Sequence, residues 1–199
     1  MKRFFDFTVS LILVLLLLPV FALIGIIIAV DAGRPVIYKQ YRVGKDNKLF
    51  YIYKFRTMKN NTRIAATKDL TEADSVITKS GRFLRKTSLD ELPQLFNVLK
   101  GDMSFVGPRP LIPEEKEIRN IRKEYGIYAV RPGITGWAQV NGRDMLGDEE
   151  KALFDKEYID KQSIAFDIKI MIKTVMVVLK RENISEGGEP DNKYNSGNS

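Results

Sequence analysis

Two adjacent acidic residues, Asp90 and Glu91, are the first candidates for chemistry in this sequence. Neighbouring carboxylates can hold Mg²⁺ through oxygen ligands, and a carboxylate can also act as a nucleophile. A structural role competes, because Ser88-x-x-Glu91 matches a capping box in which Glu91 only caps a helix. Pro93 favours a helix that begins at Asp90, since a start at Ser88 would place its missing N–H inside the helix. Both carboxylates would then lie at the positive end of the helix dipole.

A second candidate is Arg109, which lies between Pro108 and Pro110. The prolines stiffen the backbone, so the guanidinium is held in place, as a bidentate contact to phosphate requires. A surface turn that exposes an arginine would account for the same three residues.

The glycine-punctuated stretch Arg131–Arg143 contains the only tryptophan of the chain and several side-chain donors. Gln139, Asn141 and Arg143 are its candidates for contacts to a polar ligand such as a sugar or a nucleotide. A packed loop that binds nothing fits this composition nearly as well.

The residue types that are missing narrow the chemistry. The 199-residue chain has no cysteine and no histidine, which excludes zinc–thiolate sites, thiol nucleophiles and Ser–His–Asp triads. A reaction must therefore use carboxylates, amines, guanidiniums, hydroxyls or backbone groups. With 44% hydrophobic residues, the chain is long enough for one domain with a sizeable core.

A hydrophobic segment of 24 residues without a charge runs from Phe7 to Val30. As a helix it would be roughly 36 Å long, enough to cross a bilayer core of about 30 Å. Its length disfavours a buried core helix and a cleaved signal peptide. Pro19 interrupts the segment, and basic residues flank both ends, so a kinked spanning helix and a re-entrant helix both fit.

The net charge of +7 is concentrated after this segment. Ten basic residues and one acid lie between Arg34 and Lys68, which leaves −2 for the rest of the chain. Next to a membrane segment, such a block favours anionic lipid headgroups over nucleic acid. A solvated basic face is the alternative for its lysines.

The remaining pattern predicts an α+β fold, with a membrane helix at 1–33, a mostly helical domain at 34–181 and a flexible polar tail at 182–199. Alternating β-branched and aromatic residues predict a hairpin at Val36–Met58. The apolar stripe of Ser163–Arg181 favours a core-facing helix over a membrane-facing one. Further helices are predicted at Asp90–Leu99, closed by Gly101, and at 114–125 and 149–158.

Four stretches together resemble the bacterial sugar transferase family, the small monotopic phosphoglycosyl transferases. They are Lys54–Met58 (KFRTM), Leu84–Leu95 (LRKTSLDELPQL), Gly101–Pro110 (GDMSFVGPRP) and Arg131–Arg143 (RPGITGWAQVNGR). The resemblance extends from the N-terminal Lys-Arg-x-Phe-Asp to about Gly188.

This resemblance implies a fold and an activity. It implies a re-entrant helix broken at Pro19, membrane-interface helices, and a catalytic domain on the cytoplasmic face of the bacterial inner membrane. The reaction would move a sugar 1-phosphate from a UDP-sugar to polyprenyl (undecaprenyl) phosphate and release UMP, before downstream glycosyltransferases act. The expected partners include the anionic lipid bilayer, and binding to nucleic acid is not expected.

The resemblance also assigns roles to residues. Asp90 and Glu91 would work with Mg²⁺, and Asp90 would be the nucleophile that takes up the phosphosugar. Arg109 would lie beside the phosphates, while Arg56 and Arg85 match further basic positions. Asp155 matches an acidic position of the family in a less similar stretch.

Two departures leave the sugar open. Asp144–Asp148 (DMLGD) stands where relatives acting on diacetamido-bacillosamine read Asn-Ala-Ile-Ser-Trp, and the tail lacks their longer C-terminal motif. Galactose, glucose, an N-acetylhexosamine or a modified sugar all remain possible. The rival functions are a non-catalytic, membrane-anchored basic binding protein and a glycosyltransferase that releases UDP.

Overall fold

The computed structural model describes residues 1–59, 76–142 and 145–180 and shows the mixed helix-and-strand fold that the sequence predicts. The predicted tail at 182–199 lies outside these residues. The helices of four or more residues are α1 (Lys2–Asp31), α3 (Lys79–Lys86), α4 (Gln94–Lys100), α5 (Lys116–Glu124), α6 (Trp137–Val140), α7 (Asp148–Asp160) and α8 (Ile164–Lys180). The strands are β1 (Ile37–Val43), β2 (Leu49–Phe55), β3 (Ser104–Val106) and β4 (Gly133–Thr135).

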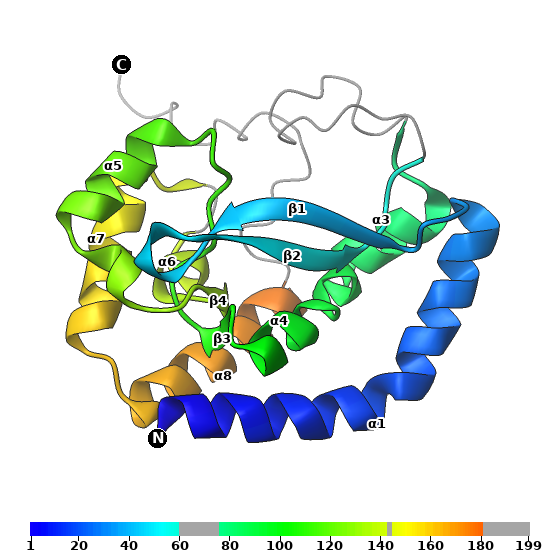
Figure 1. Cartoon of the computed structure of the whole chain (residues 1–199), viewed down its shortest axis with the longest axis horizontal. Helices are drawn as coiled ribbons and strands as arrows, with labels where there is room; N and C mark the ends of the chain where they lie inside the picture. The colour runs from blue at the N-terminus through cyan, green and yellow to red at the C-terminus, as the bar shows by residue number, and fades with distance from the viewer. Residues whose placement is uncertain (60–75, 143–144, 181–199) are drawn as a thin grey trace, which may run out of the picture.

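Helix α1 bends sharply and wraps around one corner of the domain (Figure 1). Pro19 lies inside the helix, where it removes a backbone donor and accounts for the bend. Within the described residues, α1 is the one helix long and apolar enough to cross a membrane. Large apolar side chains are exposed along both of its halves, for example Leu16 at 69% and Ile26 at 64%.

Both ends of α1 are attached to the globular domain. At the N-terminal end, Arg3 donates to the carbonyls of Val98 at 2.5 Å and Leu99 at 2.8 Å, at the end of α4. At the C-terminal end, the Asp31 carboxylate accepts a hydrogen bond of 2.8 Å from the backbone N–H of Ser80 in α3. The helix therefore leaves the domain and returns to it.

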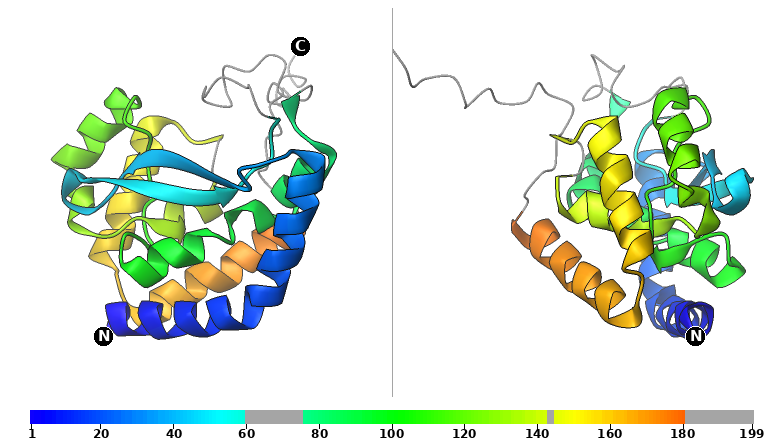
Figure 2. Two further views of the ribbon diagram at one scale, coloured as in Figure 1. Left: turned by 45° about the vertical axis from the view of Figure 1, so that its right-hand side comes forward. Right: turned by 90° about the vertical axis from the view of Figure 1, so that its left-hand side faces the viewer.

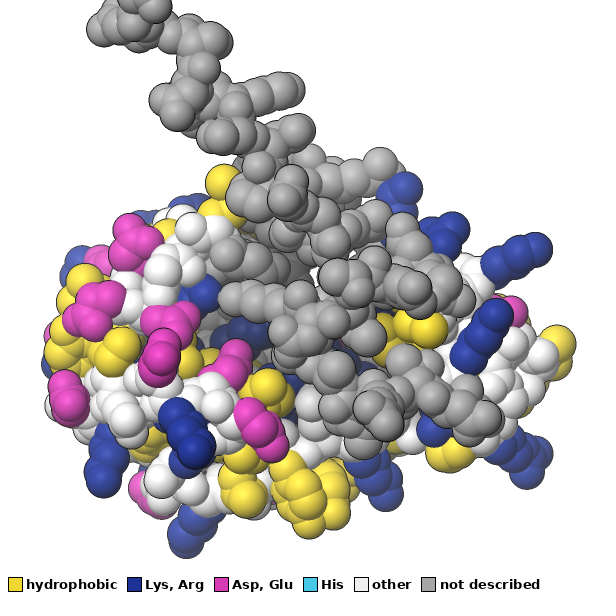
Figure 3. All heavy atoms as spheres, turned by 90° about the horizontal axis from the view of Figure 1, so that it is seen from above, with side chains coloured by type: hydrophobic (Ala, Val, Ile, Leu, Met, Phe, Trp, Pro, Cys, Tyr) yellow, Lys and Arg dark blue, Asp and Glu magenta, His cyan; other side chains and the backbone are white. Residues whose placement is uncertain are grey.

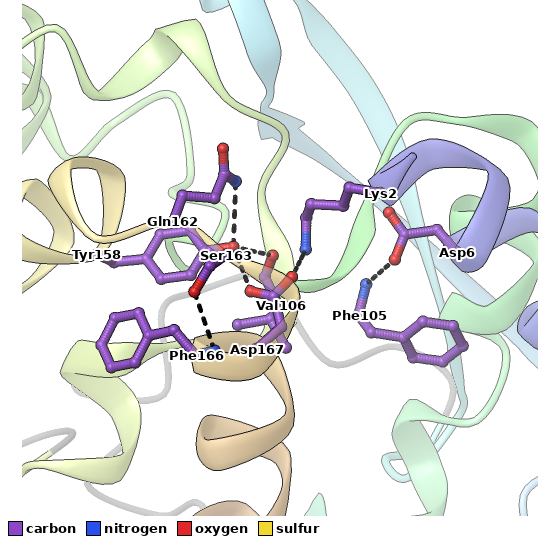
Figure 4. A network of polar contacts seen from close by, with 9 residues as sticks. All are labelled: Lys2, Asp6, Phe105, Val106, Tyr158, Gln162, Ser163, Phe166 and Asp167. Atoms are coloured by element: carbon purple, nitrogen blue, oxygen red, sulfur yellow. Dashed lines mark hydrogen bonds and ion pairs between the residues drawn. The ribbon is translucent and has the colours of Figure 1, made fainter.

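A polar network strengthens the attachment at the N-terminal end (Figure 4). Lys2 forms an ion pair of 2.5 Å with Asp167 of α8, and the Tyr158 hydroxyl donates to the same carboxylate at 2.8 Å. Asp6 is 2% exposed and accepts a bond of 3.4 Å from the backbone N–H of Phe105 in β3. These contacts join the first turns of α1 to α8 and to the small second sheet.

The predicted hairpin is confirmed as the antiparallel pair β1–β2, with Gly44 and a short 3-10 turn between the strands. It lies across the domain above α4 (Figure 1). Buried Asn97 of α4 fixes this position, because its side chain donates to the Tyr51 carbonyl at 2.6 Å and accepts from the Tyr53 N–H at 3.0 Å. This one amide side chain therefore fixes the position of β2 relative to α4.

Strands β3 and β4 form a parallel pair, and β4 lies inside the Arg131–Arg143 stretch that was predicted as a loop. The glycines of this stretch allow close backbone approach. A Cβ at Gly133 would lie 2.1 Å from the N atom of Gly107, and one at Gly136 would lie 2.2 Å from its carbonyl oxygen. At least these two glycines of the Arg131–Arg143 stretch therefore have a packing role.

Helix α8 corrects one prediction, because most of its apolar stripe is not in the core. Ile172 and Val175 are 57% and 58% exposed, whereas Ile170 is fully buried. The buried carboxylate of Asp167, held by Lys2 and Tyr158, turns the helix so that the stripe faces outward. Figures 1 and 2 show α8 beginning beside the N-terminal half of α1, so exposed apolar surface extends over both helices.

Candidate active site

A small, partly open hollow lies beneath the hairpin, and we call it the central hollow. Its charged and amide lining side chains are Arg42, Lys54, Glu91, Gln94, Arg109 and Gln139. The face seen from above in Figure 3 carries acidic side chains mainly on the side of α5 and α7. Basic side chains are visible closer to the centre and on the opposite side.

Strand periodicity and topology bring these residues together. Side chains alternate between the two faces of the hairpin, so Arg42 and Lys54 point inward, opposite the outward Tyr41. Strands β3 and β4 are parallel, and Arg109 and Gln139 follow their carboxyl ends. Carboxyl ends of parallel strands meet at one edge of a sheet, which is where ligands bind in open α/β sheets.

Asp90 and Glu91 lie in a short 3-10 turn, Leu89–Glu91, which precedes α4. The predicted helix start at Asp90 is therefore wrong, since the α-helix begins at Gln94 with Pro93 at its N-cap. The capping-box alternative is also not observed, because the Ser88 side chain makes no capping hydrogen bond. The two carboxylates are placed by the turn rather than by a helix dipole.

The two carboxylates have different surroundings. Glu91 Oε1 accepts from Lys54 Nζ at 2.7 Å. Burial raises the pKa of Asp90 to about 6, although the Lys54 ammonium pulls it down and the Glu91 carboxylate pushes it up. Arg85, whose Nε donates to the Thr57 hydroxyl at 3.0 Å, also lowers that pKa. Asp90 thus titrates close to neutral pH in the absence of a metal ion.

Of the remaining predicted basic and acidic residues, some line the central hollow and others lie behind or beside it. Arg109 lines the central hollow, and its carbonyl accepts a bond of 2.7 Å from Arg122. Asp155 is 1% exposed, pairs with Arg122 at 2.5 Å and does not line the hollow. Arg85 lies beside Asp90, and Arg56 follows directly after β2, with its backbone N–H bonded to the Val36 carbonyl at 2.9 Å.

The predicted sugar or nucleotide loop is only partly at the hollow. Gln139 lines it. Asn141 instead donates to the Trp137 carbonyl at 2.8 Å and accepts from Lys173 of α8 at 2.5 Å, on the side away from the hairpin. Arg143 lies outside the described residues.

Three of the charged and amide lining residues were not among the predicted site residues: Arg42, Lys54 and Gln94. The sequence placed Arg42 and Lys54 in a block expected to face lipid headgroups. Their alternation with Tyr41 and Tyr53 in the hairpin was the signal that could have separated inward from outward charges. Burial, and then the Arg109 charge, lower the pKa of Arg42 to about 10.

The two carboxylates could bind Mg²⁺ only together with further oxygen ligands from a substrate or water. The described residues contain no cluster of three or more His, Cys, Asp or Glu side chains. Mg²⁺ is usually held by one or two carboxylates together with substrate phosphates and water. Asp90, which receives no hydrogen bond from another side chain in the described part of the chain, and its neighbour Glu91 fit that donor set.

Comparison with known proteins shows the family to which the chain belongs. The model of the bacterial sugar transferase family matches residues 1–181, and the chain therefore belongs to this family. An uncharacterized sugar transferase, EpsL, of Bacillus subtilis is 41% identical over 186 residues, which cover 94% of this chain and 91% of the relative.

Two longer relatives have more specific names. The UDP-glucose:undecaprenyl-phosphate glucose-1-phosphate transferase of Escherichia coli is 43% identical over 88% of this chain and 39% of its own length. The undecaprenyl-phosphate galactose phosphotransferase of Salmonella typhimurium is 40% identical over 92% of this chain and 41% of its own length. The chain thus spans about two fifths of the length of these two relatives.

Proposed function

We propose that this protein transfers a sugar 1-phosphate from a UDP-sugar to polyprenyl phosphate and releases UMP. The observation that carries the proposal is the central hollow, where Glu91 lies with Lys54, Arg42 and Arg109. Asp90 is next to Glu91 in the sequence and does not itself line the hollow, but it lies close enough to Lys54 and Arg85 for both charges to lower its pKa. Such a set offers a carboxylate nucleophile together with cationic donors for a diphosphate. The names of the relatives support the same class of reaction.

The chemistry runs in two displacements. A carboxylate oxygen of Asp90 attacks the phosphorus that bears the sugar, the P–O bond to the other phosphate breaks, and UMP leaves with the electron pair. A phosphate oxygen of the polyprenyl acceptor then attacks the same phosphorus and frees the Asp90 carboxylate. Arg109 and Lys54 stabilise the charge on the non-bridging oxygens in both steps.

Asp90 and Glu91 are the residues that would hold Mg²⁺. When bound, the ion would offset the negative charge of the diphosphate. The Lys54–Glu91 ion pair of 2.7 Å holds the Glu91 carboxylate at the hollow.

We further propose that α1 enters the membrane and leaves it on the same, cytoplasmic side of the bacterial inner membrane. The attachment of both helix ends to one domain supports this topology, as does the bend at Pro19. Since the chain has no cysteine, single cysteines at Phe4 and at exposed Lys39 can be labelled separately in sealed vesicles. Labelling of both from one side is expected, and labelling from opposite sides would establish a spanning helix instead.

The activity is tested with the purified protein in nanodiscs that contain undecaprenyl phosphate and Mg²⁺. UDP-glucose, UDP-galactose and UDP-N-acetylhexosamines are supplied in turn, and UMP and UDP are measured separately. UMP release with one donor, lost on chelation, is the expected result and names the sugar. UDP release would show an ordinary glycosyltransferase, and the absence of turnover with every donor would favour a binding protein.

A further inference from the structure

Arg42 has an unused hydrogen-bond donor. Its guanidinium donates through Nη1 to the Pro110 carbonyl at 3.2 Å and through Nη2 to Gln40 Oε1 at 2.8 Å. Its Nε is buried and has no hydrogen-bond partner among the described residues. Buried donors in proteins are nearly always paired, so this N–H calls for a partner that the described residues do not supply.

Gln139, on the same hollow, has an unused acceptor. Its Nε2 donates to the Ile134 carbonyl at 3.3 Å, and because a carbonyl only accepts, this contact fixes which end of the amide is the nitrogen. Oε1 is therefore the free end, and it is buried without a partner in the described part of the chain. Two residues that line the hollow thus carry one buried donor and one buried acceptor that have no partner among the described residues.

The charges near Arg42 indicate an anion. Arg109 is close enough to repel Arg42, while Glu91, Glu115 and Tyr38 are the groups that favour its charged form. Glu91 is already paired with Lys54. An oxyanion between Arg42 and Arg109 would relieve the repulsion and accept the free Nε–H.

We infer that Arg42 and Gln139 form a subsite for the sugar 1-phosphate part of the donor. Arg42 donates to a phosphate oxygen, and Gln139 Oε1 accepts from a sugar hydroxyl. Polyprenyl phosphate provides the anion but no hydroxyl, so the pair favours the donor over the acceptor. This inference rests on the proposed function and names two further substrate-binding residues for it.

The first test measures equilibrium binding in nanodiscs without turnover. Glucose 1-phosphate, galactose 1-phosphate and inorganic phosphate are titrated into the wild type, Arg42→Met, Arg42→Lys and the matched control Lys39→Met on the outward face of β1. Arg42→Met is expected to weaken all three ligands by about 10- to 100-fold, as the loss of a charge-assisted bond does. Arg42→Lys should recover part of the loss, and Lys39→Met should bind as the wild type does.

The second test separates the hydroxyl from the phosphate. Gln139→Leu is expected to weaken the better-bound hexose 1-phosphate by about 3- to 10-fold and to leave inorganic phosphate unchanged. Equal weakening of both ligands, or of neither, would overturn the role of Gln139. Thermal unfolding of each variant shows whether the fold is retained, and Gln139→Glu provides a second variant that keeps the side-chain length.

Kinetics identify the phosphate that Arg42 contacts. A higher KM for the UDP-sugar in Arg42→Met, with an unchanged KM for undecaprenyl phosphate, supports the inference, and the reverse pattern overturns it. Failure of the proposed function is a different result. In that case the wild type binds hexose 1-phosphate and the variants lose it, but no UMP is released with any donor.

Discussion

Asp90 and Asp155 are both acidic residues that the sequence placed in the site, and the structure gives them opposite surroundings. Asp155 is fully buried, and Arg122 neutralises it at 2.5 Å. Asp90 is half-buried and has no side-chain donor among the described residues. The charges of Lys54 and Arg85 lower its pKa without a direct hydrogen bond. A paired acid is suited to hold structure, whereas an acid with free oxygens can meet a metal ion or a phosphorus atom.

The Asp155–Arg122 ion pair is linked to the central hollow indirectly, through the backbone of Arg109. Arg122 uses one nitrogen for Asp155 and another for the Arg109 carbonyl, so the pair fixes the backbone of the residue that lines the hollow. Arg122 is 3% exposed and cannot easily move. The two acids therefore differ in kind: we expect Asp90 to act on substrate and Asp155 to position Arg109.

The largest effect is expected for Asp90→Asn. The amide keeps the shape of the side chain but loses the nucleophilic oxygen, so UMP release should fall by roughly 10³-fold or more. Asp160→Asn, on the exposed surface of α7, is the matched control and should be fully active. Turnover of Asp90→Asn at the wild-type rate would refute the nucleophile and place Asp90 with Asp155 as a structural acid.

Asp155→Asn should instead affect folding. It leaves the buried Arg122 charge without its partner, and broken buried pairs typically lower the free energy of unfolding by about 3–5 kcal/mol. Denaturant unfolding of the detergent-solubilised protein measures this loss. The double variant Asp155→Leu with Arg122→Met should recover most of the stability but not the position of Arg109. Wild-type stability of Asp155→Asn would contradict the comparison.

The sequence was sufficient for the hairpin and the extent of most helices, and it singled out Glu91 and Arg109, which the structure brings to one hollow. These features depend on local patterns, such as the alternation of β1 and β2, and on motifs in one stretch of chain. The separation of Asp90 from Asp155 depends on Arg122, which lies 33 residues from its partner and has no local signal. Only the packing of α5 against α7 brings the pair together.

The orientation of α8 could not be predicted for a similar reason. Its outward stripe is as apolar as a core stripe, so periodicity alone cannot say which way it faces. The direction is set by Asp167, which bonds to Lys2, 165 residues away in the sequence, and to Tyr158 of α7. In the same way, Asn97 determines which hairpin residues reach the hollow.

Metal binding provides a third test of the comparison. Because protons compete with Mg²⁺ for Asp90, whose pKa is about 6, affinity for the ion should fall as pH drops through 6, by about tenfold per unit. The sign follows from the carboxylate, which binds the cation only when ionised. Titration of Mg²⁺ at pH 5 to 8 measures this. Asp155→Asn should keep the same dependence if it folds, whereas Asp90→Asn should lose it.

The smallest predicted shift is the change in pH dependence caused by Lys54→Met. The Lys54 ammonium is the largest influence that lowers the pKa of Asp90, so its removal should move that pKa upward from about 6. The acidic limb of the pH–rate profile should shift to higher pH by a fraction of a unit, while the loss of Lys54 as a phosphate contact should lower the rate at every pH. Lys39→Met, on the outer face of the hairpin, is the control for charge. An unchanged acidic limb would mean that Asp90 does not set the pH dependence, because no shift in Asp155 can follow from a lysine that is not among its charged neighbours.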